Sequence, residues 1–280
     1  MTEIAQLREW VGKCESLDDL AAPAPPRALA ALLDHDTPPW AEDEVPPLGH
    51  WLYFLPRAKQ SEMDIDGHPK RGGFLPPVDL PRRMFAGGSV TIHAPIAIGA
   101  SIRRDGTILD VTEKQGASGR LVFVKVRYEV FSGDTLAVTE EQDIVFREGE
   151  TVPVIAAKPI NPRLAGKTRR IEPDATMLFR FSALTFNAHR IHYDRDYACE
   201  EEYYPGLVVQ GPLIAILLLD HLLRQKPALP LRTFSFRARS PLFDTAPFEL
   251  CLAAREGGYD LWALDSIGRE AMTAEVAVAT

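Results

Sequence analysis

The sequence predicts an α+β fold that contains two copies of one unit, a helix followed by a series of antiparallel strands. Segments rich in aromatic and β-branched residues, separated by turn residues, run from residue 89 to residue 146. The strongly apolar residues 213–223 then predict a buried helix. A second series of strand-like segments follows this helix, from residue 231 to residue 278. The order of these elements suggests an internal duplication.

The elements of the first half are separated by prolines and glycines. Residues 1–20 predict an amphipathic helix with Ile4, Leu7, Trp10 and Val11 on one stripe, ended by the prolines that follow. Residues 48–55 predict a short buried helix. Residues 60–83 are rich in Gly, Pro and charge and predict a long loop, a kind of segment that is often functional. Strands are expected at 89–92, 100–104, 109–114, 121–131 and 136–146.

Three prolines between residues 150 and 168 indicate a linker. We therefore expect an N-terminal domain of residues 1–155 and a C-terminal domain of residues 156–280. In the second domain, residues 176–181 predict a strand that leads into a polar cluster. Beyond the apolar helix, strands are expected at 231–239, 247–254, 259–264 and 272–278.

Composition excludes several classes of protein. The net charge of -8 over 280 residues argues against a nucleic-acid surface. The three cysteines, Cys14, Cys199 and Cys251, are widely separated, so neither a zinc site nor a disulfide framework is indicated. No signal peptide is evident, and the longest apolar run is too short to span a bilayer. We expect a cytoplasmic protein with reduced thiols and neither a nucleic-acid nor a membrane partner.

Two segments carry the chemistry. Residues 182–194 place two histidines, an amide and a carboxylate directly after an apolar run, and imidazole is the side chain best suited to move protons near neutral pH. Residues 204–213 form a glycine turn that opens the apolar helix. The two segments are predicted to be the halves of one active site.

These segments resemble the MaoC-like dehydratase and hydratase family. The resemblance is to its two-domain members, similar to 3-hydroxyacyl-thioester dehydratases and to mesaconyl-CoA or itaconyl-CoA hydratases. It rests on residues 181–194 (FSALTFNAHRIHYD) and 205–213 (PGLVVQGPL), supported by 72–88 (GGFLPPVDLPRRMFAGG) and 140–147 (EEQDIVFR). It implies a double hotdog fold, in which two antiparallel sheets each wrap around a central helix. The C-terminal half then carries the chemistry and the N-terminal half helps to shape the acyl pocket.

The family signature, Asp-x-Asn-Pro-(Leu/Ile/Val)-His, is only partly kept. Aligned on its histidine, it places His192 at the catalytic histidine and Asn187 at the catalytic aspartate. Arg190 stands at the proline and His189 at the asparagine. The usual Asp/His dyad is therefore altered in this chain.

Hydration of an α,β-unsaturated thioester needs a base for water and donors for the enolate oxygen. His192 suits the first task, and the backbone N–H of Gly211, at the start of the apolar helix, suits the second. Asn187 can orient the water but cannot act as acid or base. The reaction moves protons without oxidation or reduction, so it requires no metal and no redox cofactor. CoA enters as part of the substrate.

Each assignment has a structural alternative. His192 can satisfy a buried hydrogen bond, Asn187 can form a turn, and Gly211 can serve only helix packing. His189 and His192 form an HxxH pair, but no third metal ligand is evident. Asp194 is expected to cap the next short helix.

The acyl-CoA substrate brings phosphates. Arg237 and Arg239 alternate on one predicted strand and are candidates to bind them, while Gln210, His189 and Tyr193 are candidate substrate contacts. Two other arginine pairs, 82–83 and 169–170, are further candidates. Any one of these arginines can equally be a solvated surface residue.

The sequence therefore predicts an enoyl-thioester hydratase or dehydratase, and the resemblance suggests a short, branched dicarboxylic acyl-CoA such as itaconyl-CoA or mesaconyl-CoA. A free carboxylate on the acyl chain requires an arginine in the pocket, and the sequence does not indicate which one. A non-catalytic acyl-thioester-binding subunit and a hotdog thioesterase are the alternatives. Exposed sheet edges also make a homo-oligomer possible.

Overall fold

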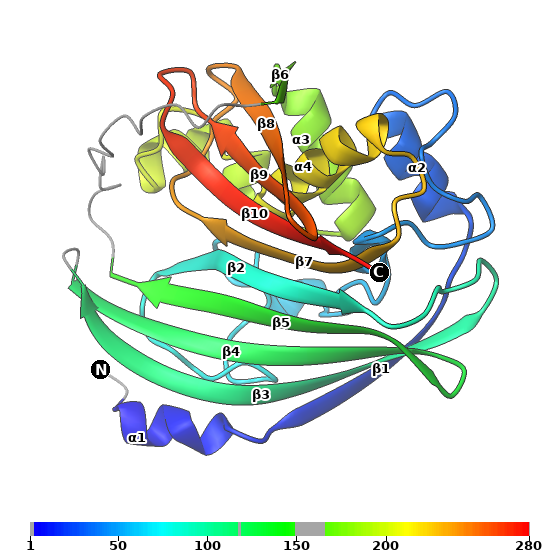
Figure 1. Ribbon diagram of the computed structural model, residues 1–280. Helices are drawn as coiled ribbons and strands as arrows, with labels where there is room; N and C mark the ends of the chain where they lie inside the picture. The colour runs from blue at the N-terminus through cyan, green and yellow to red at the C-terminus, as the bar shows by residue number, and fades with distance from the viewer. Residues whose placement is uncertain (1–2, 117–118, 149–165, 280) are drawn as a thin grey trace.

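The computed structural model describes residues 3–116, 119–148 and 166–279. Within these ranges ten strands form one antiparallel sheet, in the order β1-β3-β4-β5-β2-β7-β10-β9-β8-β6 (Figure 1). The strands of the first half are β1 (Cys14–Leu20), β2 (Arg82–Ile92), β3 (Ser101–Gly116), β4 (Gly119–Ser132) and β5 (Thr135–Arg147). Those of the second half are β6 (Lys167–Ile171), β7 (Leu231–Ala238), β8 (Phe248–Arg255), β9 (Gly258–Leu264) and β10 (Glu270–Val278).

The two halves of the sheet have the same strand order. From the centre outward, each half presents its second, fifth, fourth, third and first strand. The halves join where β2 pairs with β7, from Gly87 opposite Arg237 to Thr91 opposite Thr233. The predicted duplication and the α+β class are confirmed, with the two sheets fused edge to edge into one. The expected domain boundary after residue 155 lies outside the described residues and stays a prediction.

The apolar segment forms the predicted buried helix, α4 (Gly211–Gln225), in which eleven of fifteen residues are buried. The helix contacts β8, β9 and β10, so it fills the inner face of the C-terminal half. Its one buried carboxylate, Asp220, lies 2.5 Å from both His35 and Arg169 and 2.9 Å from Arg224. These contacts fix the C-terminal end of the helix to the surrounding structure.

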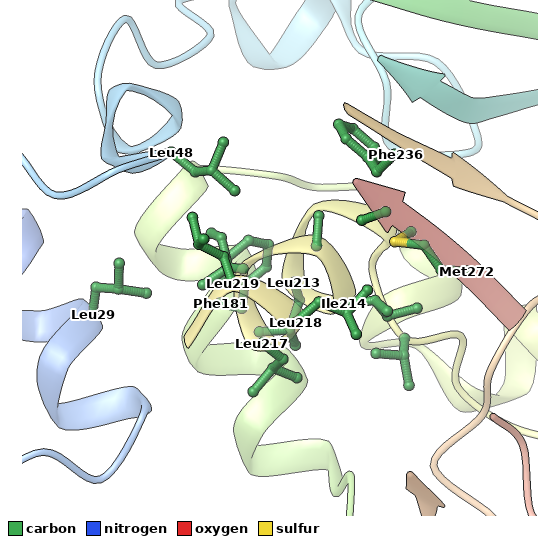
Figure 2. Packing of buried hydrophobic residues seen from close by; sticks show 14 of the residues in the cluster. Leu29, Leu48, Phe181, Leu213, Ile214, Leu217, Leu218, Leu219, Phe236 and Met272 are labelled. Atoms are coloured by element: carbon green, nitrogen blue, oxygen red, sulfur yellow. The ribbon is translucent and has the colours of Figure 1, made fainter. Parts of the chain in front are cut away.

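The expectation that each half wraps around a central helix is wrong for the N-terminal half, which has no helix of this kind under its strands in the described part of the chain. Its nine-residue helix, α2 (Ala24–Leu32), instead contacts α3 (Ala175–Thr185) at one side of the molecule (Figure 1). Figure 2 shows Leu29 of α2 facing the cluster that Phe181 of α3 forms with Leu217 of α4. A second, smaller core lies under the N-terminal strands, made of Leu7, Val78, Leu80, Ile108, Val111, Val122, Val124, Val126, Ile144 and Phe146.

Two predicted elements are wrong. Residues 176–181 belong to helix α3, because Asp174 caps it by accepting a hydrogen bond from the Met177 N–H at 2.7 Å, and the helical spacing of Leu178, Phe181 and Ser182 buries one face. The predicted N-terminal helix ends at Trp10, after α1 (Ile4–Leu7) and η1 (Arg8–Trp10). Beyond it the chain turns and forms the edge strand β1.

The remaining short helices are η2 (Gly49–Leu52), η3 (Gln60–Glu62), η4 (Arg190–His192) and η5 (Tyr197–Glu201). The first confirms a helical segment within residues 48–55, and the loop expected at 60–83 contains only η3 before β2 begins. The strand segments expected at 100–104 and 109–114 are one continuous strand, β3. Among the described helices, none has the length and apolar character needed to cross a membrane.

Candidate active site

The histidine-bearing segment begins where α3 ends. Phe186 adopts a left-handed backbone (φ 48°), and the N–H of Asn187 donates to the Ser182 carbonyl at 2.9 Å. The Asn187 side-chain oxygen then accepts the His189 N–H at 3.1 Å. This places Asn187 in the turn that reverses the chain, as in the structural alternative, while its NH2 group has no hydrogen bond among the described residues.

His192 is buried, with only 7% of its surface exposed. Its Nδ1 lies 2.7 Å from the Val208 carbonyl oxygen. Because a carbonyl can only accept, Nδ1 carries the proton and Nε2 keeps its lone pair. Burial lowers the pKa of His192 to about 4, although the Val208 contact opposes the shift. The imidazole is therefore neutral at pH 7 and able to accept a proton.

The same hydrogen bond connects His192 to the start of α4. Val208, which also donates its N–H to the Ile191 carbonyl at 2.9 Å, lies three residues before Gly211. The Gly211 N–H has no acceptor among the described residues, as expected for the first turn of a helix. A Cβ at this position would meet only Phe85, at 3.7 Å or more. Packing therefore does not require this glycine, which weakens the structural alternative.

Gln210 lies directly before this amide and is fully buried. Its Nε2 donates to the Leu178 carbonyl at 2.9 Å and to the Ser182 hydroxyl at 3.0 Å, and both partners lie in α3. Its Oε1 is buried without a partner in the described part of the chain. Gln210 thus joins the start of α4 to α3 and holds the Gly211 amide in place.

A loop from the N-terminal half covers the histidine segment. The N–H of Arg190 donates to the Asp66 carbonyl at 2.9 Å. Gly67 has a φ of +87° and lies so close that a Cβ there would be 1.8 Å from the Ala188 oxygen. This contact brings His68 against His189, with ring centroids 4.2 Å apart, and His189 lies 5.3 Å from His192.

The cluster combines one carboxylate with imidazole rings that pack against each other. Asp66 accepts from the backbone N–H of His68 at 2.8 Å and lies 2.9 Å from its Nδ1. Burial alone would raise the pKa of Asp66, but the His68 hydrogen bonds and charge outweigh it and lower that pKa. Burial lowers the pKa of both His68 and His189. Asp66 and His68 lie in the long loop expected at residues 60–83, but no motif in the sequence marks either as a site residue.

A set of potential metal ligands adjoins the HxxH pair, although it includes His189 and not His192. Asp66, His68 and His189 each offer a ligand atom within 4.8 Å of the others. However, Asp66 already binds Nδ1 of His68, and the ring centroids of His68 and His189 are only 4.2 Å apart. Two imidazoles on a tetrahedral ion hold their centroids about 5 Å apart. The arrangement fits a hydrogen-bonded network better than a metal site.

The other predicted residues lie elsewhere. Asp194 caps the next helix, as expected, by accepting the Tyr197 N–H at 3.1 Å. Tyr193 is exposed beside it.

The arginines expected to bind phosphates do not gather at the site. Arg237 and Arg239 are exposed, and Arg237 alternates on β7 with the buried Phe236, so Arg237 lies on the outer face of the sheet. Three of the four other candidate arginines form ion pairs: Arg82 with Glu202, Arg169 with Asp220 and Arg170 with Glu172.

Comparison with known proteins identifies the family. The family model described as hydroxyacyl-thioester dehydratase type 2 matches residues 48–244. A mesaconyl-C(4)-CoA hydratase of Chloroflexus aurantiacus is 49% identical over 269 residues, which cover 95% of this chain and 96% of that protein. Both names describe hydro-lyases, the class of enzyme that the sequence predicts.

Solved structures show the same fold. HtdX of Mycobacterium tuberculosis superposes with a TM-score of 0.67 at 19% identity, covering 95% of this chain and 100% of that chain. Another Mycobacterium tuberculosis protein, described as having a double hotdog fold, gives a TM-score of 0.56 at 12% identity and covers 96% of both chains. The expected fold and class of enzyme are confirmed, and the chain belongs to the hydroxyacyl-thioester dehydratase type 2 family.

Proposed function

We propose that this protein adds water reversibly across the double bond of a short, branched dicarboxylic acyl-CoA of the mesaconyl-C(4)-CoA kind. The observation that carries the proposal is the hydrogen bond from His192 to Val208, in the segment that leads to Gly211. A buried neutral imidazole and a helix-terminal amide without an acceptor among the described residues are joined through Val208. The 49% identical relative, a mesaconyl-C(4)-CoA hydratase, supports the choice of acyl group.

In the proposed hydration, Nε2 of His192 takes a proton from water, whose pKa is about 15.7, as its oxygen attacks the β-carbon. The π electrons move to the thioester oxygen, where the Gly211 N–H stabilises the enolate. The imidazolium then returns its proton to the α-carbon, and the C–S bond stays intact. Every step uses groups of this chain, the substrate and water, so the mechanism needs neither a metal nor a redox cofactor.

Two further groups support the base. The NH2 group of Asn187 can donate to the attacking water and orient it. Asn187 stands where the family signature has an aspartate, so this chain lacks that carboxylate. Asp66 supplies another carboxylate near the histidines. Its negative charge favours the imidazolium that forms during turnover. We therefore assign His192 and the Gly211 amide as catalytic, and Asp66 as a positioning residue that acts through His68 and His189.

One assay separates this proposal from its alternatives. Purified protein is incubated with mesaconyl-C(4)-CoA while the absorbance of the conjugated thioester and the release of free thiol are followed together. Loss of conjugation without thiol release is the expected result. Thiol release would instead indicate a thioesterase. No reaction across a panel of enoyl-CoA thioesters would indicate a binding subunit, and both outcomes contradict hydration.

A further inference from the structure

Arg82 and Arg83 are neighbours at the start of β2 but lie on opposite faces of the sheet. Arg82 is buried and forms an ion pair with Glu202 at 2.9 Å. Arg83 pairs across the sheet with Phe146 of β5, a core residue of the inner face, so Arg83 shares that face. The inner face is the one that α4 and the histidine cluster approach.

Arg83 lies on the same strand face as the residue nearest Gly211. Phe85, two residues along β2, would contact a Cβ at Gly211 at 3.7 Å. Two residues of a strand span about 7 Å, so the backbone of Arg83 lies one such step from Phe85, the residue that adjoins the start of α4. On its other side, His68 and His189 are close enough for the positive charge of Arg83 to lower the pKa of both rings.

The guanidinium of Arg83 has neither an ion pair nor a hydrogen bond within the described ranges, although the side chain is only partly exposed. Arg71, whose charge also acts on Arg83, donates to the carbonyls of Val78 and Leu80. An arginine presents five N–H donors in a planar fork, and withdrawing them from water without an acceptor is unfavourable. Burial lowers the pKa of Arg83, and the charges of Tyr128 and Asp66 oppose this shift, yet no hydrogen bond or ion pair joins either group to the guanidinium within the described ranges. The fork of Arg83 is therefore free to bind a further anion.

The proposed substrate carries such an anion in a defined place. In a C4 thioester of mesaconate, the β-carbon that water attacks carries both a methyl group and the free carboxylate. The group that binds this carboxylate must lie beside the base and across the pocket from the thioester. Binding it also reduces the repulsion between the carboxylate and the incoming oxygen.

We propose that Arg83 binds the free carboxylate of a dicarboxylic acyl-CoA and so selects it over a monocarboxylic one. The inference rests on the proposed function and names the residue that sets its substrate class. Arg83 fits this role better than the other candidates, because Arg82 and Arg71 already have partners and Arg237 lies on the outer face. A guanidinium and a carboxylate can form two parallel hydrogen bonds, which gives directional recognition.

Binding of saturated, unreactive analogues tests the inference without turnover. Methylsuccinyl-CoA, linked through the carboxyl group distant from its methyl branch, and 3-methylbutyryl-CoA differ only by a carboxylate in place of a methyl group. We expect the unmodified protein to bind the first about tenfold to a hundredfold more tightly, as charge-assisted hydrogen bonds allow. In Arg83→Gln this preference should disappear, and in Arg83→Lys it should be partly kept.

The matched control is Arg127→Gln. It removes an exposed arginine of β4 that is paired with Glu141, and it should leave the preference unchanged. Equal affinity for the two analogues in the unmodified protein would overturn the inference. So would a folded Arg83→Gln or Arg83→Lys protein that keeps the full preference. If the preference depends on Arg83 but no enoyl-CoA is hydrated, the proposed function fails while the carboxylate site stands.

Discussion

The two halves of the molecule share a strand order but fill their inner faces differently. In the C-terminal half, the fifteen-residue helix α4 is buried against β8, β9 and β10. In the N-terminal half, α2 packs beside α3, and the irregular chain before β2 covers the strands instead. The inner face of this half also keeps polar side chains: Arg83, Tyr128, Glu140 and Gln142.

This difference indicates a division of labour within one duplicated fold. A buried apolar helix holds the Gly211 amide, directly after the segment whose Val208 carbonyl orients His192. A polar inner face and an ordered loop bring Asp66, His68 and Arg83 to the same place from the other half. We infer that the C-terminal half carries the chemistry and the N-terminal half recognises the acyl group.

The largest effect is expected from His192→Ala. Removing the base should lower the rate of hydration by roughly 10²–10⁴-fold, the usual contribution of general acid–base catalysis. Circular dichroism should show that the fold is kept, and His93→Ala, an exposed histidine bonded to Thr139, serves as the matched control. Unchanged kinetics in His192→Ala would contradict the assignment of catalysis to the C-terminal half.

A smaller loss is expected from Gly211→Ala. A Cβ at this position fits beside Phe85, so the thermal stability should change little. The methyl group would keep the thioester oxygen away from the amide, and loss of one oxyanion donor costs about 10²-fold or more in kcat. Gly73→Ala, where a Cβ has no neighbour within 4 Å, is the control. Full activity in Gly211→Ala would argue against this amide as the enolate donor.

The buried histidine also predicts a dependence of stability on pH. The pKa of His192 is about 4 in the folded protein, below the ordinary histidine value of 6.5 that applies to the unfolded chain, so between these values only the unfolded chain binds the proton. This difference therefore reduces the free energy of unfolding as the pH falls below 6.5, by about 2 kcal/mol at pH 5. Urea unfolding of the unmodified protein and of His192→Ala, at pH 7 and at pH 5, measures this loss in free energy of unfolding. The loss should be smaller in His192→Ala. Equal losses in the two proteins would contradict a neutral, buried His192.

The smallest effect is expected from Asn187→Asp. A carboxylate can still accept the His189 N–H, so the turn after α3 should be kept, and the substitution restores the carboxylate usual in the family signature. Steady-state kinetics should show retained hydration. An inactive but folded Asn187→Asp protein would mean that the amide itself is essential, for example to hold the water.

Much of the fold could be predicted because strand alternation and the all-round apolar character of α4 are local signals. The helix α3 was missed because its Met-Leu-Phe-Arg-Phe run has strand-like composition, whereas the cap from Asp174 and its tertiary burial decide its state. Strand β1 was missed because an edge strand with alternating half-exposed polar residues carries little apolar signal.

The candidate site shows the same limit. His192 and Gly211 lie in two motifs close together in sequence, and their family resemblance made them predictable. Asp66 and His68 lie over a hundred residues away, and only the docking of Gly67 against Ala188 brings them to the histidines. Arg83 and Arg82 are equivalent in sequence, and only the strand register shows that one is paired and the other faces the site.

The most direct test of this division of labour is the ratio of kcat/KM for mesaconyl-C(4)-CoA to that for 3-methylcrotonyl-CoA, measured in three proteins. These substrates differ by one carboxylate on the attacked carbon. We expect His192→Ala to lower both values by the same factor and keep the ratio of the unmodified protein. Arg83→Gln should instead bring the ratio close to one while largely sparing the second substrate. Equal loss on both substrates in Arg83→Gln, or a changed ratio in His192→Ala, would contradict the account.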